Sequence, residues 1–143
     1  MKIKRLFAMT VALCLFLTGC SKSFDWNKNV EKVENLGFVV FNSSANEEDL
    51  NRNNDLINAD IKLMGGEFSV ELDNAIALNK EENDNYYNCM FFDFKDDEQA
   101  KSYYDLYLDT RSNENQYKLS FNKDIVVVTN SQEVIEVLGY QFK

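Results

Sequence analysis

Residues Tyr86–Phe94 read YYNCMFFDF, which is the strongest strand pattern in this chain. Successive side chains of a strand point to opposite faces, so two sets of side chains alternate here. One face receives Asn88, Met90, Phe92 and Phe94, and the other receives Tyr87, Cys89 and Phe91. Both sets are largely apolar, which is typical of a strand that is covered on both faces. We therefore expect this strand to lie in the middle of a sheet.

The apolar spacing on either side of this strand predicts further strands and helices. The expected strands are Phe38–Phe41, Glu67–Leu78 with a bulge or turn at Asp73–Asn74, and Tyr117–Thr129 with a hairpin bend at 122–124. Four helices are expected. The first is Asp25–Leu36, and the second follows the capping pair Ser44 and Glu47 and reaches Met64. The third runs from Asp96 to Leu108, and the fourth, Gln132–Leu138, follows the capping pair Asn130 and Glu133. Polar residues predict a loop at Asn79–Asn85 and a turn at Asn113–Asn115.

One part of this assignment has a rival. Gly65 and Gly66 are able to join Asp60–Met64 to Phe68–Leu72 as a hairpin. The helical spacing before these glycines extends further, so we expect the helix.

The six middle elements follow the order β-α-β-β-α-β, which is the order of the ferredoxin-like split βαβ unit. We therefore expect an α+β fold with an antiparallel sheet, extended by one extra N-terminal helix and one extra C-terminal helix. In a ferredoxin-like fold two helices cover one face of the sheet, which leaves the other face open. The extra helices Asp25–Leu36 and Gln132–Leu138 are expected to cover that face, including strand Phe38–Phe41; the alternative is a dimer or ligand surface.

The N-terminal residues have the features of an export signal. Lys2, Lys4 and Arg5 precede the short apolar run Leu6–Thr18, which falls short of the ~20 residues that span a bilayer. The run ends in Leu17-Thr18-Gly19-Cys20, which resembles the lipobox of bacterial lipoproteins. The alternative is an ordinary secreted protein in which a cysteine follows the run by chance.

The resemblance implies that the Cys20 sulfur receives a diacylglyceryl group and that residues 1–19 are removed as a signal peptide. Residues 20–23 then form a lipidated tether of about 10 Å, and residues 24–143 form a single domain. Acylated with palmitate-type chains, the protein is expected at the extracytoplasmic face of the cell membrane, held by its lipid anchor.

Charge excludes one class of partner. Residues 20–143 keep 12 of the 15 basic residues and all 24 acidic residues, which gives a formal charge near −12. Such a surface repels phosphate backbones and anionic lipid heads, so we expect no nucleic-acid binding and no basic membrane-binding face.

Residue types also limit the chemistry. The chain has no histidine, which excludes Ser-His and Cys-His catalysis. Cys14 leaves with the signal peptide and Cys20 carries lipid, so Cys89 is left without a disulfide partner and is expected to be a small core residue.

Carboxylates and tyrosines gather in two places. Clustered carboxylates can bind a metal ion or act in acid–base catalysis, but the first turn of a helix favours the same residues. We therefore expect no metal, no cofactor and no catalytic residue. The tyrosines either line a binding face or close the rim of a core. The two groups are Asp93, Asp96, Asp97 and Glu98, and Tyr86, Tyr87, Tyr103, Tyr104 and Tyr107.

These observations predict a non-catalytic lipoprotein domain that binds a protein or peptide partner near the bilayer. A second hypothesis is a small-molecule or cation binder that uses its acidic loops. A third is a cell-wall glycan hydrolase, which needs two facing carboxyl groups about 5–9.5 Å apart.

Overall fold

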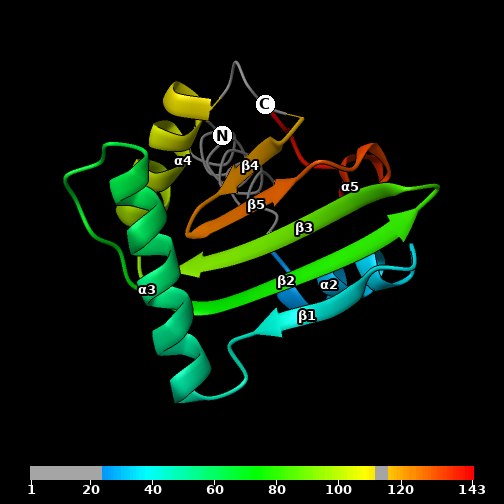
Figure 1. Ribbon diagram of the computed structural model, residues 1–143, viewed down its shortest axis with the longest axis horizontal. Coiled ribbons are helices and arrows are strands. Elements are labelled where there is room, and N and C mark those ends of the chain that lie inside the picture. The colour runs from blue at the N-terminus through cyan, green and yellow to red at the C-terminus, as the bar shows by residue number, and fades with distance from the viewer. Residues whose placement is uncertain (1–23, 112–115) are drawn as a thin grey trace, which may run out of the picture.

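The structure is a computed structural model that describes residues 24–111 and 116–143. Over these residues the chain forms a five-stranded antiparallel sheet and four helices (Figure 1). In chain order the elements are α2 (Trp26–Glu34), β1 (Val39–Ser43), α3 (Glu47–Leu63), β2 (Leu72–Glu82), β3 (Asn85–Phe94), α4 (Asp97–Arg111), β4 (Lys118–Asn122), β5 (Ile125–Thr129) and α5 (Gln132–Leu138). The lipobox, the Cys20 tether and the expected turn at Asn113–Asn115 lie outside the described residues.

The predicted middle strand is confirmed. The strand order is β1-β2-β3-β5-β4, so β3 is central and every neighbouring pair is antiparallel. The expected polar loop at Asn79–Asn85 is wrong, because β2 continues to Glu82 and pairs it with Asn85. Asn83 and Asp84 both have positive φ (53° and 62°), so a two-residue turn joins the strands directly.

The ferredoxin-like arrangement is not confirmed, because the strand order differs. In a split βαβ unit, the strands that a helix joins run parallel with another strand between them. Here α3 joins β1 to β2, which are direct neighbours and antiparallel. Helix α3 crosses the strand ends instead of running back along the sheet (Figure 1). The chain therefore enters β2 at the end of the sheet where it left β1.

Two asparagine side chains of α3 form hydrogen bonds with the segment that leads from α3 back into β2. The Asn58 side chain accepts from the backbone N of Val70 at 2.8 Å and donates to the carbonyl of the same residue at 2.9 Å. The Asn54 side chain accepts from the backbone N of Leu72 at 2.7 Å, where β2 begins. Helix α3 itself is confirmed against the rival hairpin, and Ile57 and Ile61 are buried on its inner face.

Helices cover both faces of the sheet. Residues of α3 and α4 pack with one face around Phe94, Leu119 and Val126. Residues of α2 and α5 pack with the other face around Phe91 and Val127. The predicted cover of the second face by the extra N-terminal and C-terminal helices is therefore confirmed.

Two capping predictions are wrong, although both helices form. Asn46 caps α3 by accepting from the backbone N of Asp49 at 2.9 Å, and Ser131 caps α5. The expected caps are engaged elsewhere. Ser44 Oγ accepts from the Asn53 side chain at 3.0 Å, and Asn130 Oδ1 accepts from a backbone N of β3 at 2.7 Å.

The prediction that both faces of the first strand are covered is also wrong. β1 is an end strand with β2 on one side, and Val39 and Phe41 are 65% and 57% exposed. Phe38, just before the strand, is buried at 3% exposure and supplies the inward contact. An unbroken apolar run does not distinguish an inner strand from an exposed edge.

Candidate functional site

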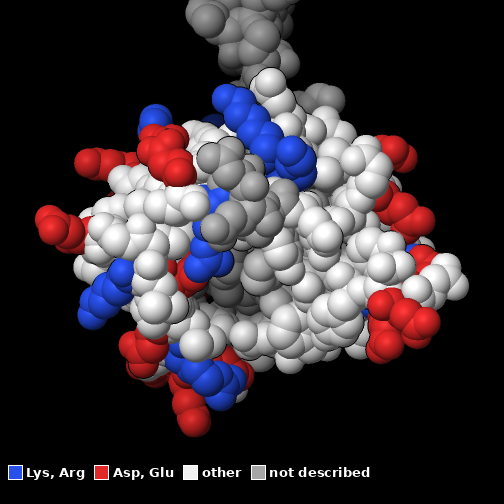
Figure 2. All heavy atoms as spheres, turned by 45° about the horizontal axis from the view of Figure 1, so that its top comes forward, with Lys and Arg blue, Asp and Glu red and all other residues white. Residues whose placement is uncertain are grey.

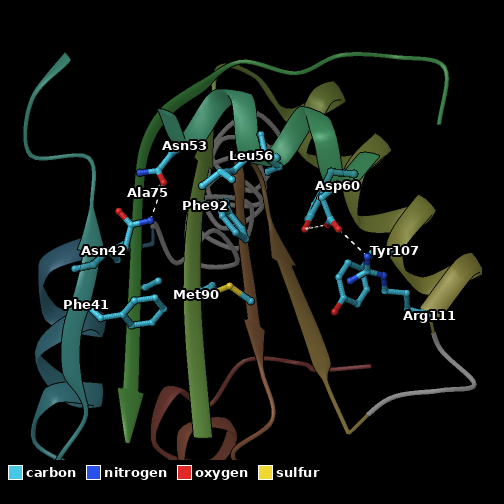
Figure 3. Close-up of a pocket in the computed structure, with 14 residues that line it drawn as sticks. Phe41, Asn42, Asn53, Leu56, Asp60, Ala75, Met90, Phe92, Tyr107 and Arg111 are labelled. Carbon is cyan, nitrogen blue, oxygen red and sulfur yellow. Dashed lines mark hydrogen bonds and ion pairs between the residues drawn. The ribbon is translucent and has the colours of Figure 1, made fainter. Parts of the chain in front are cut away.

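A groove opens on the α3–α4 side of the sheet, over strand residues that neither helix covers (Figure 3). Its volume is about 320 Å³. Ala75 and Ala77 of β2 and Met90 and Phe92 of β3 form the floor, and side chains of β1, α3 and α4 form the walls. The small alanine side chains make room between the bulkier residues around them.

A bulge in β1 aims two neighbouring side chains into this groove. Val40 pairs with Leu78 and Asn42 pairs with Ala77, so Phe41 is an extra residue in the register. Neighbours in a regular strand point to opposite faces, but a bulge re-aims one of them. Phe41 and Asn42 both line the groove as a result.

The open part of the groove is apolar. Phe41 of β1 and Leu56 of α3 line it from different elements, and each is 57% exposed (Figure 3). Figure 2 shows a hollow near the middle of the face in view, with uncharged surface to its right and basic side chains at its left edge. An apolar group that enters leaves water at a gain of about 25 cal/mol per Å².

Amide groups line the groove beside β1. Asn42 donates from Nδ2 to Asn53 Oδ1 at 2.8 Å, and Asn53 in turn donates to Ser44 Oγ. Asn53 is buried on α3, so this chain of hydrogen bonds ties the bulged strand to the helix above it. It holds the two walls at a fixed separation.

An ion pair lines the groove on the α4 side. Arg111, the last residue of α4, donates to Asp60 of α3 at 2.7 Å, and its guanidinium lies 5.3 Å from the centre of the Tyr107 ring. Tyr103 donates to the other oxygen of Asp60 at 3.5 Å. Burial, followed by the Asp60 charge, raises the pKa of Tyr103, so its hydroxyl stays protonated as a donor. The pair joins α3 to α4 above the sheet.

The carboxylates that the sequence grouped are divided by the structure. Asp96 accepts from the backbone N of Gln99 at 2.9 Å at the start of α4, as expected of a helix cap. Asp93 lies on β3, and burial, followed by the charges of Asp124 and Asp73, raises its pKa to about 6. In the parts of the chain that are described, no three His, Cys, Asp or Glu side chains form a group suited to a metal ion.

The expectation that Cys89 is a core residue is confirmed. Its side chain is fully buried in the α2–α5 layer, and burial raises the pKa of the thiol. The five tyrosines do not form one binding face. Tyr103 and Tyr107 line the groove, Tyr104 packs on Phe121 below α4, Tyr87 belongs to the α2–α5 layer, and Tyr86 is exposed on the hairpin.

Most groove residues carried no functional signal in the sequence. The sequence predicts Phe41 and Met90 in strands that are covered on both faces, with a dimer or ligand surface as the alternative for the strand that contains Phe41, and nothing in it singles out Arg111. Tyr103 and Tyr107 are the two members of the tyrosine group that line the groove.

No protein-family model matches this chain, and the searches of curated proteins and of solved structures give no match either. Among the described helices, none combines the length and the apolar character needed to cross a membrane. The groove is therefore identified as a candidate site from its geometry alone.

Proposed function

We propose that this chain is a lipoprotein, anchored through Cys20 at the extracytoplasmic face of the cell membrane, that binds a protein or peptide partner in the groove. The observation that carries this proposal is the open apolar floor around Ala77 and Met90, bordered by the exposed side chains of Phe41 and Leu56. The lipobox resemblance supports the anchor.

The position of Phe24 supports a groove that faces away from the anchor. Its ring lies 5.4 Å from that of Tyr140 and 6.1 Å from that of Phe91, within the α2–α5 layer. Three residues separate Cys20 from Phe24, and the four residue-to-residue steps between them span at most about 14 Å. An anchor within this reach of Phe24 would leave the groove, which opens on the opposite layer, accessible to partners in solution.

The side chains that line the groove are suited to binding. Its polar side chains already pair with one another, Asp60 with Arg111 and Asn42 with Asn53. Among the described lining residues Asp60 is the one carboxylate, whereas glycoside hydrolysis uses two. The volume of about 320 Å³ also favours a second candidate function, the binding of a small apolar molecule.

The anchor is tested by Cys20→Ser. The variant should leave the membrane fraction and lose palmitate labelling, because the thioether can no longer form. A variant that stays in the membrane fraction without a label, or keeps the label, contradicts the anchor.

The groove is tested by crosslinking in intact membranes. A photoreactive phenylalanine analogue is placed at Leu56, and a matched control at Lys101, which is exposed on α4. Adducts with one defined protein from Leu56 alone support the proposal. Adducts with a small molecule alone favour the second candidate, and equal adducts from both positions contradict a groove-specific site.

A further inference from the structure

The two outer edges of the sheet differ in their backbone hydrogen bonding. The outer edge of β4 is paired, because Leu119 and Lys143 exchange two backbone hydrogen bonds of 2.9 Å. The outer edge of β1 pairs with no other strand in the described residues. β1 reads VVFNS, so it lacks the charged residues and prolines that protect many exposed edges from pairing, although the strand is short and carries the bulge at Phe41.

We propose that an extended peptide segment of a partner protein, with an apolar middle and basic ends, adds to β1 as a further strand and places apolar side chains at the groove. The proposal rests on the proposed function and names the class of partner. Strand addition supplies affinity through main-chain hydrogen bonds and specificity through alternate side chains. The side chains on the groove side would meet Val39 and Phe41, which are exposed apolar neighbours on β1.

Acidic residues near both ends of β1 are the reason for proposing a segment with basic ends. One end leads into the first turn of α3, which carries Glu47, Glu48 and Asp49, the last of which pairs with Arg52 (Figure 1). The other end lies along β2 where that strand approaches the hairpin with Glu81, Glu82 and Asp84. Lys80 pairs with Glu82 at 3.1 Å, but Glu81 and Asp84 have no ion-pair partner within the described chain. Basic residues on both sides of an apolar centre complement this pattern.

The same charges argue against a second copy of this chain as the occupant. Antiparallel pairing of two β1 strands would place the α3 end of one copy beside the hairpin end of the other. Both ends are acidic, so like charges would face each other at both ends of the interface. A basic partner avoids this repulsion.

The test uses a synthetic peptide as the probe. Its centre alternates valine and phenylalanine over the length of β1, and lysines flank it on both sides. A second peptide has glutamates in place of the lysines, and a third is N-methylated at alternate central amides. Binding of each to the lipidated full-length protein in detergent is measured by fluorescence anisotropy.

The lysine peptide should bind, and the glutamate peptide should bind at least about tenfold more weakly because of charge repulsion. N-methylation should weaken binding by about tenfold or more, because it removes main-chain donors. Equal binding of the N-methylated peptide, or tighter binding of the glutamate peptide, overturns strand addition by a basic segment. A dimer that forms through β1 without peptide overturns it as well.

Matched variants locate the charges. Glu48→Gln with Glu81→Gln should weaken the lysine peptide and reduce its salt dependence. Glu98→Gln with Glu136→Gln makes the same charge change on exposed residues of α4 and α5 and should leave binding unchanged. Equal effects of both pairs contradict the proposed position.

These outcomes separate the inference from the proposed function. If no peptide binds but Leu56 still crosslinks one protein in membranes, strand addition is wrong and the groove function stands. If Leu56 gives no specific adduct and the lysine peptide binds with full sensitivity to N-methylation, strand addition stands without the groove.

Discussion

Filling the groove tests whether its floor is open. Ala77→Leu adds about three carbons to a residue that faces a space of about 320 Å³, so the larger side chain should fit without strain. At about 0.8 kcal/mol per buried CH₂, and with half of the added surface covered, the variant should gain about 1 kcal/mol of unfolding free energy.

Ala100→Leu is the matched control, because Ala100 is fully buried on α4 and does not line the groove. The same three carbons must there displace close-packed neighbours, which costs about 1–3 kcal/mol. In thermal unfolding followed by circular dichroism, the two midpoints should differ by roughly 8 °C or more, at about 4 °C per kcal/mol. If Ala77→Leu is destabilised as much as Ala100→Leu, the floor is covered and the reasoning fails.

Three further outcomes are expected. Asp93→Asn should stabilise the protein by about 1 kcal/mol near pH 7, a value discounted for solvent screening. The raised pKa of Asp93 (about 6) makes the stability of the wild type fall as pH rises through 6, and the amide avoids this loss. The gain should vanish below about pH 4, and a gain that does not depend on pH refutes this cause. Cys89 should react with a thiol reagent only as fast as the protein unfolds, and rapid reaction under native conditions contradicts its burial. Asn58→Ala should lower the free energy of unfolding, measured in urea, by about 2–3 kcal/mol, because two hydrogen bonds to Val70 are lost. The control Asn51→Ala changes an exposed asparagine and should alter this free energy by under about 0.5 kcal/mol. Similar losses in both variants refute the role of Asn58.

Local patterns in the sequence were sufficient for the existence of most elements and for the two faces of the central strand. The alternation in Tyr86–Phe94 placed Cys89 and Phe91 on one side and Met90 and Phe92 on the other, which the two core clusters confirm. The first and last helices, which are additional to the β-α-β-β-α-β order, were likewise predicted to cover the second face, and they do. These features depend on the spacing of apolar residues along the chain, which can be seen in a short stretch of sequence.

The strand order could not be read in this way. The order β-α-β-β-α-β is compatible with a parallel or an antiparallel return from α3. The observed return is accompanied by hydrogen bonds between Asn58 and Val70, which lie twelve positions apart. The groove depends in turn on where α3 lies across the sheet. No local pattern signals that position.

The bulge at Phe41 was equally hidden. A one-residue shift of register is needed before Phe41 and Asn42 point the same way, and nothing in VVFNS announces it. An apolar run on an edge strand reads like a covered strand. The functional interpretation of β1 therefore required the structure.

The most direct measurement of the central claim is the crosslinking yield from Leu56 in intact membranes, with and without Ala77→Leu. If the groove holds a partner, the filled variant should keep its fold and membrane location but lose the specific adduct. An unchanged adduct in the filled variant would contradict the claim that the partner occupies this groove.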